Sequence, residues 1–259
     1  MRSRFMKELP TPEIEQFLRA GGKTALIPVG CVEMHGLHCP IGTDSLIAEA
    51  FCLLVAEAGN GLVFPTIEYT WAGSTDGFAG TISVEAGHVE KLAVEVARKA
   101  WRTGFRQVVL VSVHHTNHYP LFVAARHLFE TDGIPAMYLR PAAPLSDEAE
   151  RLIPPGNVET SLLLGALEIL GKGSLYSESE MQADETCPPS DFPLAPIQHG
   201  VVGSFMQDER QHVQRSPLAS AEAGRRFLEA QCNAVVPEIN KLDAYAKHCR
   251  GQKNQGTWR

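Results

Sequence analysis

Gln107–Val113 reads QVVLVSV and is followed at once by the polar run His114–His118, HHTNH. A short apolar run rich in β-branched residues is typical of a strand that is buried on both faces of a parallel sheet. The polar residues behind it would lie at the carboxyl end of that strand, where ligands bind in such sheets. This stretch therefore predicts a fold class and also the edge of the sheet that carries a site.

Three more runs resemble strands, and helical patterns separate them. The strand-like runs are Thr24–Val29 (TALIPV), Leu62–Ile67 and Pro135–Leu139. Helices are expected from about Thr43 to Ala58, from Ser83 to Gly104, from Tyr119 to Glu130 and from Val158 to Leu170, with Thr43, Ser83 and Asn117 as N-caps. Strand–helix alternation of this kind predicts the α/β class, as a three-layer α/β/α sandwich with a mostly parallel central sheet.

The C-terminal third follows this pattern less closely. Residues 171–215 are rich in Pro and Gly and lose apolar periodicity, which predicts hidden short strands or a lid. Ser216-Pro217 is expected to begin a long helix that Pro237 weakens. We expect residues 1–259 to form a single domain, with 250–259 as a mobile polar tail.

Composition excludes several classes of protein. The 259 residues include 23 Lys and Arg against 30 Asp and Glu, a net charge of −7, and no Lys/Arg run exceeds two. A nucleic-acid-binding surface is therefore not expected. Apolar runs stop short of the ~18 residues of a membrane span, and the N-terminus lacks the apolar core of a signal peptide. Six cysteines without CxxC spacing indicate reduced thiols and a cytoplasmic protein.

Ionisable side chains gather where the predicted strands end. Carboxylates and imidazoles together suit Zn, Mn or Fe better than Ca or Mg, and two ions sharing a bridging carboxylate need about five such ligands. Each histidine taken alone is more simply a hydrogen-bonded residue without chemistry. Zincin, serine-hydrolase and nucleotide-binding motifs are absent. The clustered residues are Glu33, His35, His38 and Asp44 after the first strand, and His114, His115, Asn117 and His118 after QVVLVSV.

Pro28–Asp44, PVGCVEMHGLHCPIGTD, resembles the first motif of the creatininase (creatinine amidohydrolase) family. Further resemblance follows in order along the chain. Phe78–Ser83 is similar to the family's F-P-G-T-x-S, and Gly156–Leu162 contains its G-x-x-E-T-S-L. Gly200–Gly203 and Ala219–Arg226 are similar to its C-terminal pattern. The resemblance covers nearly the whole chain.

The resemblance implies an α/β enzyme that hydrolyses a C–N amide bond, often cyclic, with one or two divalent metal ions. The implied substrate is a small cyclic amide or a formamide, and the implied assembly is a homo-oligomer, as large as a hexamer. Glu33 resembles the ligand of one metal and His35 the ligand of the other. Asp44 resembles the bridging carboxylate, and His114 resembles a further ligand histidine.

Departures from the family pattern affect the expected mechanism. Thr116 stands where creatininase has a ligand glutamate, and Pro154 stands where it has a histidine that transfers protons. His115 or His118 is therefore the predicted source of proton transfer. Glu159 is also a candidate catalytic residue, since it either approaches the metals or only caps its helix.

Two cysteines also depart from the pattern. Cys31 replaces the usual serine and Cys39 the usual leucine. Both are interpreted as packing variants, although Cys31 could be a soft group behind a metal.

The remaining polar residues are assigned by their position. His38, Ser74, Asp76 and Asn117 are candidates to bind substrate, and His38 could equally support the ligands. His88, His127, His212 and His248 are predicted to have no chemical role. Two alternatives stay open: another hydrolytic chemistry at the same metals, on a lactone or a formyl group, or a non-catalytic binding or regulatory protein.

Overall fold

The computed structural model describes residues 1–153, 158–183, 186–187 and 203–254. Pro154, most of the loop before Val158 and the Gly200–Val202 part of the C-terminal pattern lie outside the described residues. The strands are β1 (Thr24–Pro28), β2 (Gly61–Val63), β3 (Gln107–Val111) and β4 (Ala136–Leu139). The α-helices are α1 (Thr11–Arg19), α2 (Thr43–Gly59), α3 (Ala86–Arg102), α4 (His118–Arg126), α5 (Asp147–Glu150), α6 (Val158–Ile169), α7 (Glu178–Met181) and α8 (Ala221–Asn254). Shorter helical turns are η1 (Met6–Glu8), η2 (Gly73–Thr75), η3 (His127–Thr131), η4 (Gly173–Leu175) and η5 (Glu209–Gln211).

In the described part of the chain, the strands form one four-stranded parallel sheet in the order β2-β1-β3-β4. β1 and β3 are the central pair and are buried along their whole length. Their register aligns Pro28 with Val111, so both strands end at the same edge of the sheet. The loops after these two strands therefore begin side by side.

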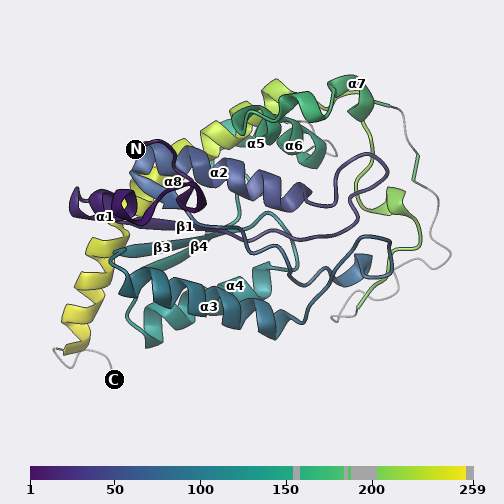
Figure 1. Cartoon of the computed structure of the whole chain (residues 1–259). Coiled ribbons are helices and arrows are strands. Elements are labelled where there is room, and N and C mark those ends of the chain that lie inside the picture. Colours follow the sequence, from purple (N-terminus) through teal and green to yellow (C-terminus); the bar gives the residue numbers. More distant parts are fainter. Residues whose placement is uncertain (154–157, 184–185, 188–202, 255–259) are drawn as a thin grey trace.

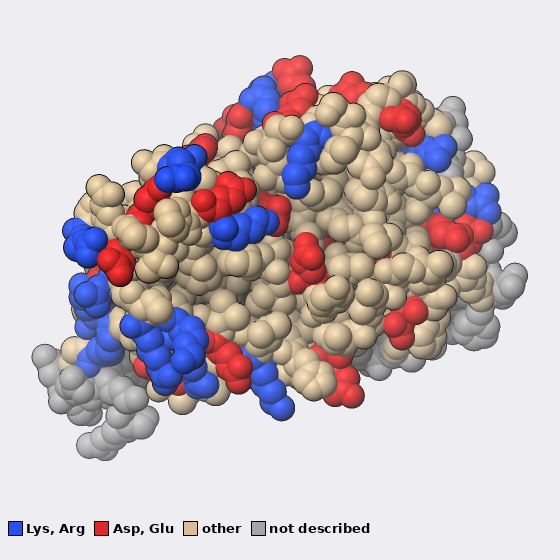
Figure 2. All heavy atoms as spheres, viewed as in Figure 1, with Lys and Arg blue, Asp and Glu red and all other residues tan. Residues whose placement is uncertain are grey.

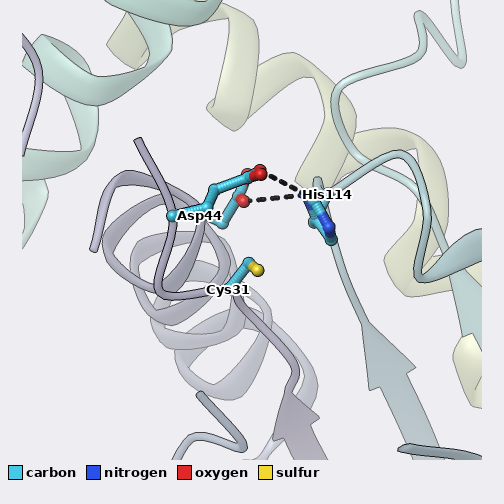
Figure 3. Close-up of side chains that lie close together, drawn as sticks. Cys31, Asp44 and His114 are labelled. Atoms are coloured by element: carbon cyan, nitrogen blue, oxygen red, sulfur yellow. Dashed lines mark ion pairs between the residues drawn. The ribbon is translucent and has the colours of Figure 1, made fainter. Parts of the chain in front are cut away.

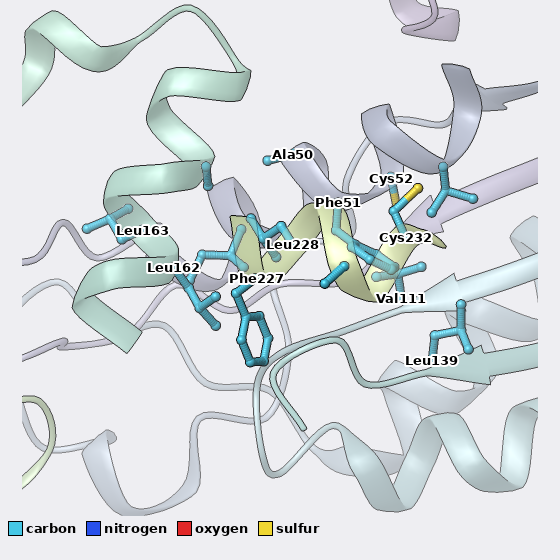
Figure 4. Close-up of a cluster of buried hydrophobic side chains, with 14 of the residues drawn as sticks. Ala50, Phe51, Cys52, Val111, Leu139, Leu162, Leu163, Phe227, Leu228 and Cys232 are labelled. Atoms are coloured by element: carbon cyan, nitrogen blue, oxygen red, sulfur yellow. The ribbon is translucent and has the colours of Figure 1, made fainter. Parts of the chain in front are cut away.

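Helices cover both faces of the sheet, so the predicted three-layer sandwich is confirmed. Figure 1 shows α2, α6 and α8 on one side of the strands and α3 and α4 on the other. One apolar cluster joins α2, α6 and α8 to the sheet through Phe51, Leu162 and Phe227 (Figure 4). A second cluster joins α3 and α4 to the opposite face. Burial on both faces explains the uninterrupted apolar character of Val108–Val111.

Of the three predicted N-caps, Thr43 and Ser83 are wrong and Asn117 is confirmed as the N-cap residue of α4. α2 begins at Thr43 with Gly42 as its cap, and the Thr43 hydroxyl donates to the Pro40 carbonyl. α3 begins only at Ala86, and the Ser83 hydroxyl accepts from the Ala72 amide instead. Asn117 does precede α4, but its side chain makes no capping bond. Ser83 and Asn117 bond to other segments, whereas Thr43 bonds back within its own loop.

The C-terminal third also differs from expectation. The described parts of 171–215 contain short helical turns and no strand. The long helix begins at Ala221 rather than at Ser216, and the Ser220 hydroxyl accepts from the Ala223 amide. Pro237 lies inside α8 without ending it. Residues 250–254, expected to belong to a mobile tail, are helical.

α6 and α8 approach each other more closely at two glycines than any side chain would allow. A Cβ atom on Gly224 would lie 1.7 Å from the Ser161 carbonyl oxygen. A Cβ atom on Gly165 would lie 2.2 Å from the backbone nitrogen of Arg225. Since both obstacles are backbone atoms, no rotamer change relieves them. This crossing fixes the position of α6, whose first turn carries Glu159.

Charge on the surface is not segregated. Figure 2 shows acidic and basic side chains both spread over the visible face. Among the described residues, no helix is both long enough and apolar enough to cross a membrane. The charges that bear on function are instead buried at the end of the sheet.

Gly224→Ala and Gly165→Ala should each lower the free energy of unfolding by about 1–3 kcal/mol, the usual cost of overpacking. Gly87→Ala is the matched control, because Gly87 is an exposed residue of α3 and an added Cβ would have nothing within 4 Å. That variant should gain about 0.5–1 kcal/mol from the reduced backbone freedom of alanine. Urea unfolding of the three variants checks this, and equal stability of all three would contradict the close crossing.

Candidate metal centre and active site

A buried carboxylate, Asp44, lies at the centre of the site. It is the second residue of α2 and faces two histidines from two different loops. Its Oδ2 atom lies 3.1 Å from Nδ1 of His114, behind β3, and 3.7 Å from Nε2 of His35, behind β1. The shared edge of β1 and β3 thus brings these three predicted ligands together.

Hydrogen bonds fix which nitrogen of each histidine faces Asp44. Nδ1 of His35 lies 3.0 Å from the Glu33 carbonyl oxygen, and Nε2 of His114 lies 2.9 Å from the Trp71 carbonyl oxygen. A carbonyl only accepts, so these nitrogens are the donors. In the neutral rings, the lone pairs of His35 Nε2 and His114 Nδ1 then point at the carboxylates. This is the arrangement that histidine ligands of metals use.

Two more carboxylates complete the cluster. Oε1 of Glu33 lies 2.8 Å from Nδ1 of His114, while its Oε2 accepts from the Thr75 hydroxyl. Oε1 of Glu159, in the first turn of α6, lies 3.3 Å from Nε2 of His35. Glu159 therefore approaches the site, which was one of its two predicted roles.

The ligand atoms form groups that share residues. In two of them the atoms lie within 4.8 Å of one another and have Asp44 in common. One holds Cys31, Glu33, Asp44 and His114, and the other holds His35, Asp44 and Glu159. Figure 3 shows Asp44 and His114 facing each other, with the Cys31 side chain next to this pair. A carboxylate common to two groups is suited to bridge two ions.

Burial and the neighbouring charges shift the pKa of each residue in the cluster in opposite directions. Burial raises the pKa of Asp44, but His114 and His35 outweigh it and hold that pKa far below its usual range. Burial likewise raises the pKa of Glu33, which bonding to His114 and His212 lowers overall. Burial lowers the pKa of His35 and His114, and Asp44 raises both well above the ordinary value. The metal-free cluster is therefore held together by paired opposite charges.

The donor set fits a divalent metal. When the ring protons of His35 and His114 lie on the nitrogens that face the carbonyls, three buried acceptor atoms, Glu33 Oε1, His35 Nε2 and Asp44 Oδ2, have no hydrogen-bond donor. Buried polar atoms without such partners are costly, and a cation would provide the missing interaction for all three. Carboxylate oxygen with imidazole nitrogen favours Zn, Mn or Fe.

A pocket of about 390 Å³ opens onto the cluster. Glu33, Asp44, His114, Glu159 and His212 form its polar part. The apolar part comes from α2, α6 and the loops after the strands: Ile47, Ala72, Val113, Ala142, Val158, Leu162 and Met206. An apolar pocket with a few convergent polar groups is the usual form of a small-molecule site.

The structure places the other predicted residues unevenly. Ser74 and His115 line the pocket. Asp76 is exposed and is not part of the pocket wall, so its substrate-binding assignment is not supported. Nε2 of His38 lies 3.1 Å from the Thr160 hydroxyl, which ties the first loop to α6. This contact favours the supporting role over substrate binding for His38.

The structure does not place Asn117 and His118 where their predicted roles in substrate binding and proton transfer need them. Asn117 is fully buried, and its amide donates to the Gly30 carbonyl at 2.9 Å, so it anchors the loop and cannot reach substrate. His118 packs against Tyr119, Phe122 and Tyr138, away from the pocket wall. His118 is the first residue of α4 and is not part of the pocket wall that His115 lines.

His212 was missed. Its Nε2 lies 3.5 Å from Oε1 of Glu33, and its ring centroid lies 4.7 Å from that of His35. The segment that carries it packs against the first loop, because Gly36 has φ +68° and leaves no room for a Cβ beside the Val213 carbonyl. The only sequence signal was a histidine in an aperiodic segment, which did not indicate this neighbourhood.

Residues 7–239 match the family model Creatininase, described as creatinine amidohydrolase. The chain belongs to the creatininase family. It is 34% identical over 224 residues to the mycofactocin precursor peptide peptidase of Mycolicibacterium smegmatis, over 83% of this chain and 84% of that protein. It is 32% identical over 121 residues to creatinine amidohydrolase of Pseudomonas putida, over 45% of this chain. That alignment spans about half, 46%, of the Pseudomonas enzyme.

Solved structures agree with the family assignment. A crystal structure of creatinine amidohydrolase matches 93% of this chain and 98% of its own, with TM-score 0.72 and 26% identity. A manganese form of creatininase and a Zn-Zn form of a mutant creatininase each match with TM-score 0.71 and 25% identity, over 93% of this chain and 98% of their own. These matches confirm the predicted fold and the predicted class, a metal-dependent hydrolase of C–N bonds.

Protein purified without chelator should contain divalent metal, and Asp44→Ala should lose most of it, because Asp44 belongs to both ligand groups. Asp76→Ala is the matched control, since it removes an exposed carboxylate outside the pocket. Elemental analysis of the three proteins measures this. Full metal content in Asp44→Ala, or full activity in metal-free protein, would contradict the assignment.

Proposed function

We propose that this chain hydrolyses the C–N amide bond of a small molecule, with Glu33, His35, Asp44, His114 and Glu159 holding two divalent ions. The observation that carries the proposal is the pair of ligand groups that share Asp44 and border a 390 Å³ pocket. When bound, such ions polarise the amide carbonyl and activate water. Other hydrolytic chemistry at the same centre, on a lactone or a formyl group, is the alternative.

The residues around the ligands keep them oriented. The Trp71 carbonyl holds Nε2 of His114, and the Thr116 hydroxyl donates to the same carbonyl. The Thr75 hydroxyl holds Oε2 of Glu33 and leaves Oε1 toward the ligands. Side chains fixed in this way need little reorganisation when the substrate reacts.

His115 is the proposed proton-transfer residue. It follows the ligand His114 directly and lines the pocket, and its side chain is exposed at the mouth. An imidazole nitrogen there can donate a proton to the nitrogen that leaves when the amide breaks. His212 also borders the pocket, but it contacts Glu33 and His35 and is better placed to support them. His118 is no longer a candidate.

The substrate proposal rests on the pocket wall. Ile47, Leu162 and Met206 offer apolar surface in the same pocket as the ligands, which favours an amide that carries an apolar group. A peptide-like amide satisfies this, and the similarity to a relative named as a peptide peptidase agrees with it. Thr116 stands where creatininase has a ligand glutamate, and its hydroxyl bonds to the Trp71 carbonyl and offers no carboxylate to a metal, which argues against creatinine.

We also propose that the protein is cytoplasmic and forms a homo-oligomer, with a hexamer as the assembly that the family resemblance implies. Exposed Tyr119, Phe122 and Val123 on α4 supply apolar surface for subunit contact. Four of the six cysteines are buried, which suits reduced thiols in a reducing compartment.

His115→Ala should lower kcat by ~10²–10⁴, the usual effect of losing a proton-transfer group, with metal content unchanged. His118→Ala is the matched control, because its ring lies outside the pocket, and it should turn over like the parent. Steady-state kinetics and metal analysis of both variants, together with His212→Ala, measure this. A loss confined to His212→Ala with metal retained would assign the proton transfer to His212 instead.

Creatinine should be a poorer substrate than N-formyl or dipeptide amides that carry an apolar side chain. Met206→Ser should lower kcat/KM for the apolar substrates by about tenfold, since a pocket discriminates by ~1–3 kcal/mol for each methylene. The value for creatinine should stay nearly constant, because creatinine has no chain to reach Met206. Parallel kinetics on a panel of cyclic amides, formamides and short peptides measures this, and creatinine as the best substrate would contradict it.

A further inference from the structure

Cys31 belongs to the wall of the metal cluster. Its Sγ atom is grouped with one ligand atom each of Glu33, Asp44 and His114, and all four atoms lie within 4.8 Å of one another. All four residues are buried. Figure 3 shows the sulfur between the end of β1 and the His114 ring, on the side where Asp44 also points. The family resemblance implies serine at this position, so it assigns no ligand here.

The spacing suits a common ion. Ligands bound at ~2.0–2.3 Å from one ion lie about 3.3–3.8 Å apart in tetrahedral geometry, and never more than ~4.6 Å apart. All four atoms lie within 4.8 Å of one another, and Nδ1 of His114 lies 2.8 Å from Glu33 Oε1 and 3.1 Å from Asp44 Oδ2. A movement of the Cys31 side chain toward these three atoms would complete the set around one ion.

Charge balance also favours a sulfur ligand. Two divalent ions bring four positive charges, and Glu33, Asp44 and Glu159 bring three negative ones. An unbalanced charge is costly in a buried site. A thiolate at Cys31 supplies a fourth negative charge without any group entering from outside, which the usual serine could not do.

We propose that Cys31 is a ligand of the ion held by Glu33, Asp44 and His114, and that its sulfur biases this position toward Zn²⁺ over Mn²⁺. The thiol proton leaves to solvent as the bond between Sγ and the ion forms. Thiolate is a soft ligand that favours Zn²⁺, whereas Mn²⁺ prefers carboxylate oxygen and water. This inference rests on the proposed metal centre and adds a ligand to it.

Cobalt is the probe that tests the sulfur ligand without relying on activity. Metal-free full-length protein is titrated with Co²⁺, and the near-ultraviolet charge-transfer band from sulfur to cobalt is recorded with the visible cobalt bands. Parent protein should show both. Cys31→Ser should keep the visible bands and lose the charge-transfer band. Cys39→Ser is the matched control, a buried cysteine of the same loop that belongs to no ligand group, and it should keep both.

Competition between Zn²⁺ and Mn²⁺ gives a second readout. The preference for Zn²⁺ should fall at least ~10-fold in Cys31→Ser, a loss of the size seen even for groups that only support a ligand. Cys31→Ala should lose the charge-transfer band as well, which guards against a serine-specific disturbance of folding.

The possible failures are distinguishable. A charge-transfer band that persists in Cys31→Ser, or an unchanged Zn²⁺ to Mn²⁺ preference, would overturn the sulfur ligand and leave the metal centre intact. Absence of cobalt binding by the parent protein would overturn the metal centre itself.

Discussion

The pairing of the buried Asp44 carboxylate with two imidazoles is the interaction on which the rest of the site depends. Removing a carboxylate from water costs several kcal/mol unless opposite charge compensates it. His35 and His114 provide that charge from the loops behind β1 and β3. The parallel register that ends these strands together is therefore a condition for the site as well as for the sheet. Either protonated imidazoles or metal ions can satisfy the carboxylate, which makes the same pocket a binding site for metal.

More distant parts of the fold serve this arrangement. The glycine crossing holds α6 against α8, and Glu159 in the first turn of α6 reaches His35. The segment after residue 203 packs on the first loop at Gly36 and delivers His212 to Glu33. Each contact joins residues that are far apart in sequence. The site is thus assembled by helix packing as much as by the loops that carry its motif.

The sequence predicted what depends on local pattern. All four strands were expected because each is an apolar run bounded by polar residues, and the four ligands that the structure brings together lie in two short motifs. The Ser83 N-cap failed because its hydroxyl bonds to the Ala72 amide, and no local rule describes such a partner. His118 lies outside the pocket wall because its ring packs against Tyr119, Phe122 and Tyr138. His212 lay in an aperiodic segment, so its approach to Glu33 could only come from tertiary packing.

The departures from the family pattern form a consistent set. Behind β3, the position where creatininase has a ligand glutamate is Thr116, which holds the Trp71 carbonyl and with it the orientation of His114. Behind β1, the position of the usual serine is Cys31, whose sulfur lies within 4.8 Å of ligand atoms of Glu33, Asp44 and His114. One loop has thus lost a hard oxygen ligand while the adjacent loop has gained a soft sulfur. Since softness selects among divalent ions, the two changes together move the centre toward zinc and keep its charge balanced.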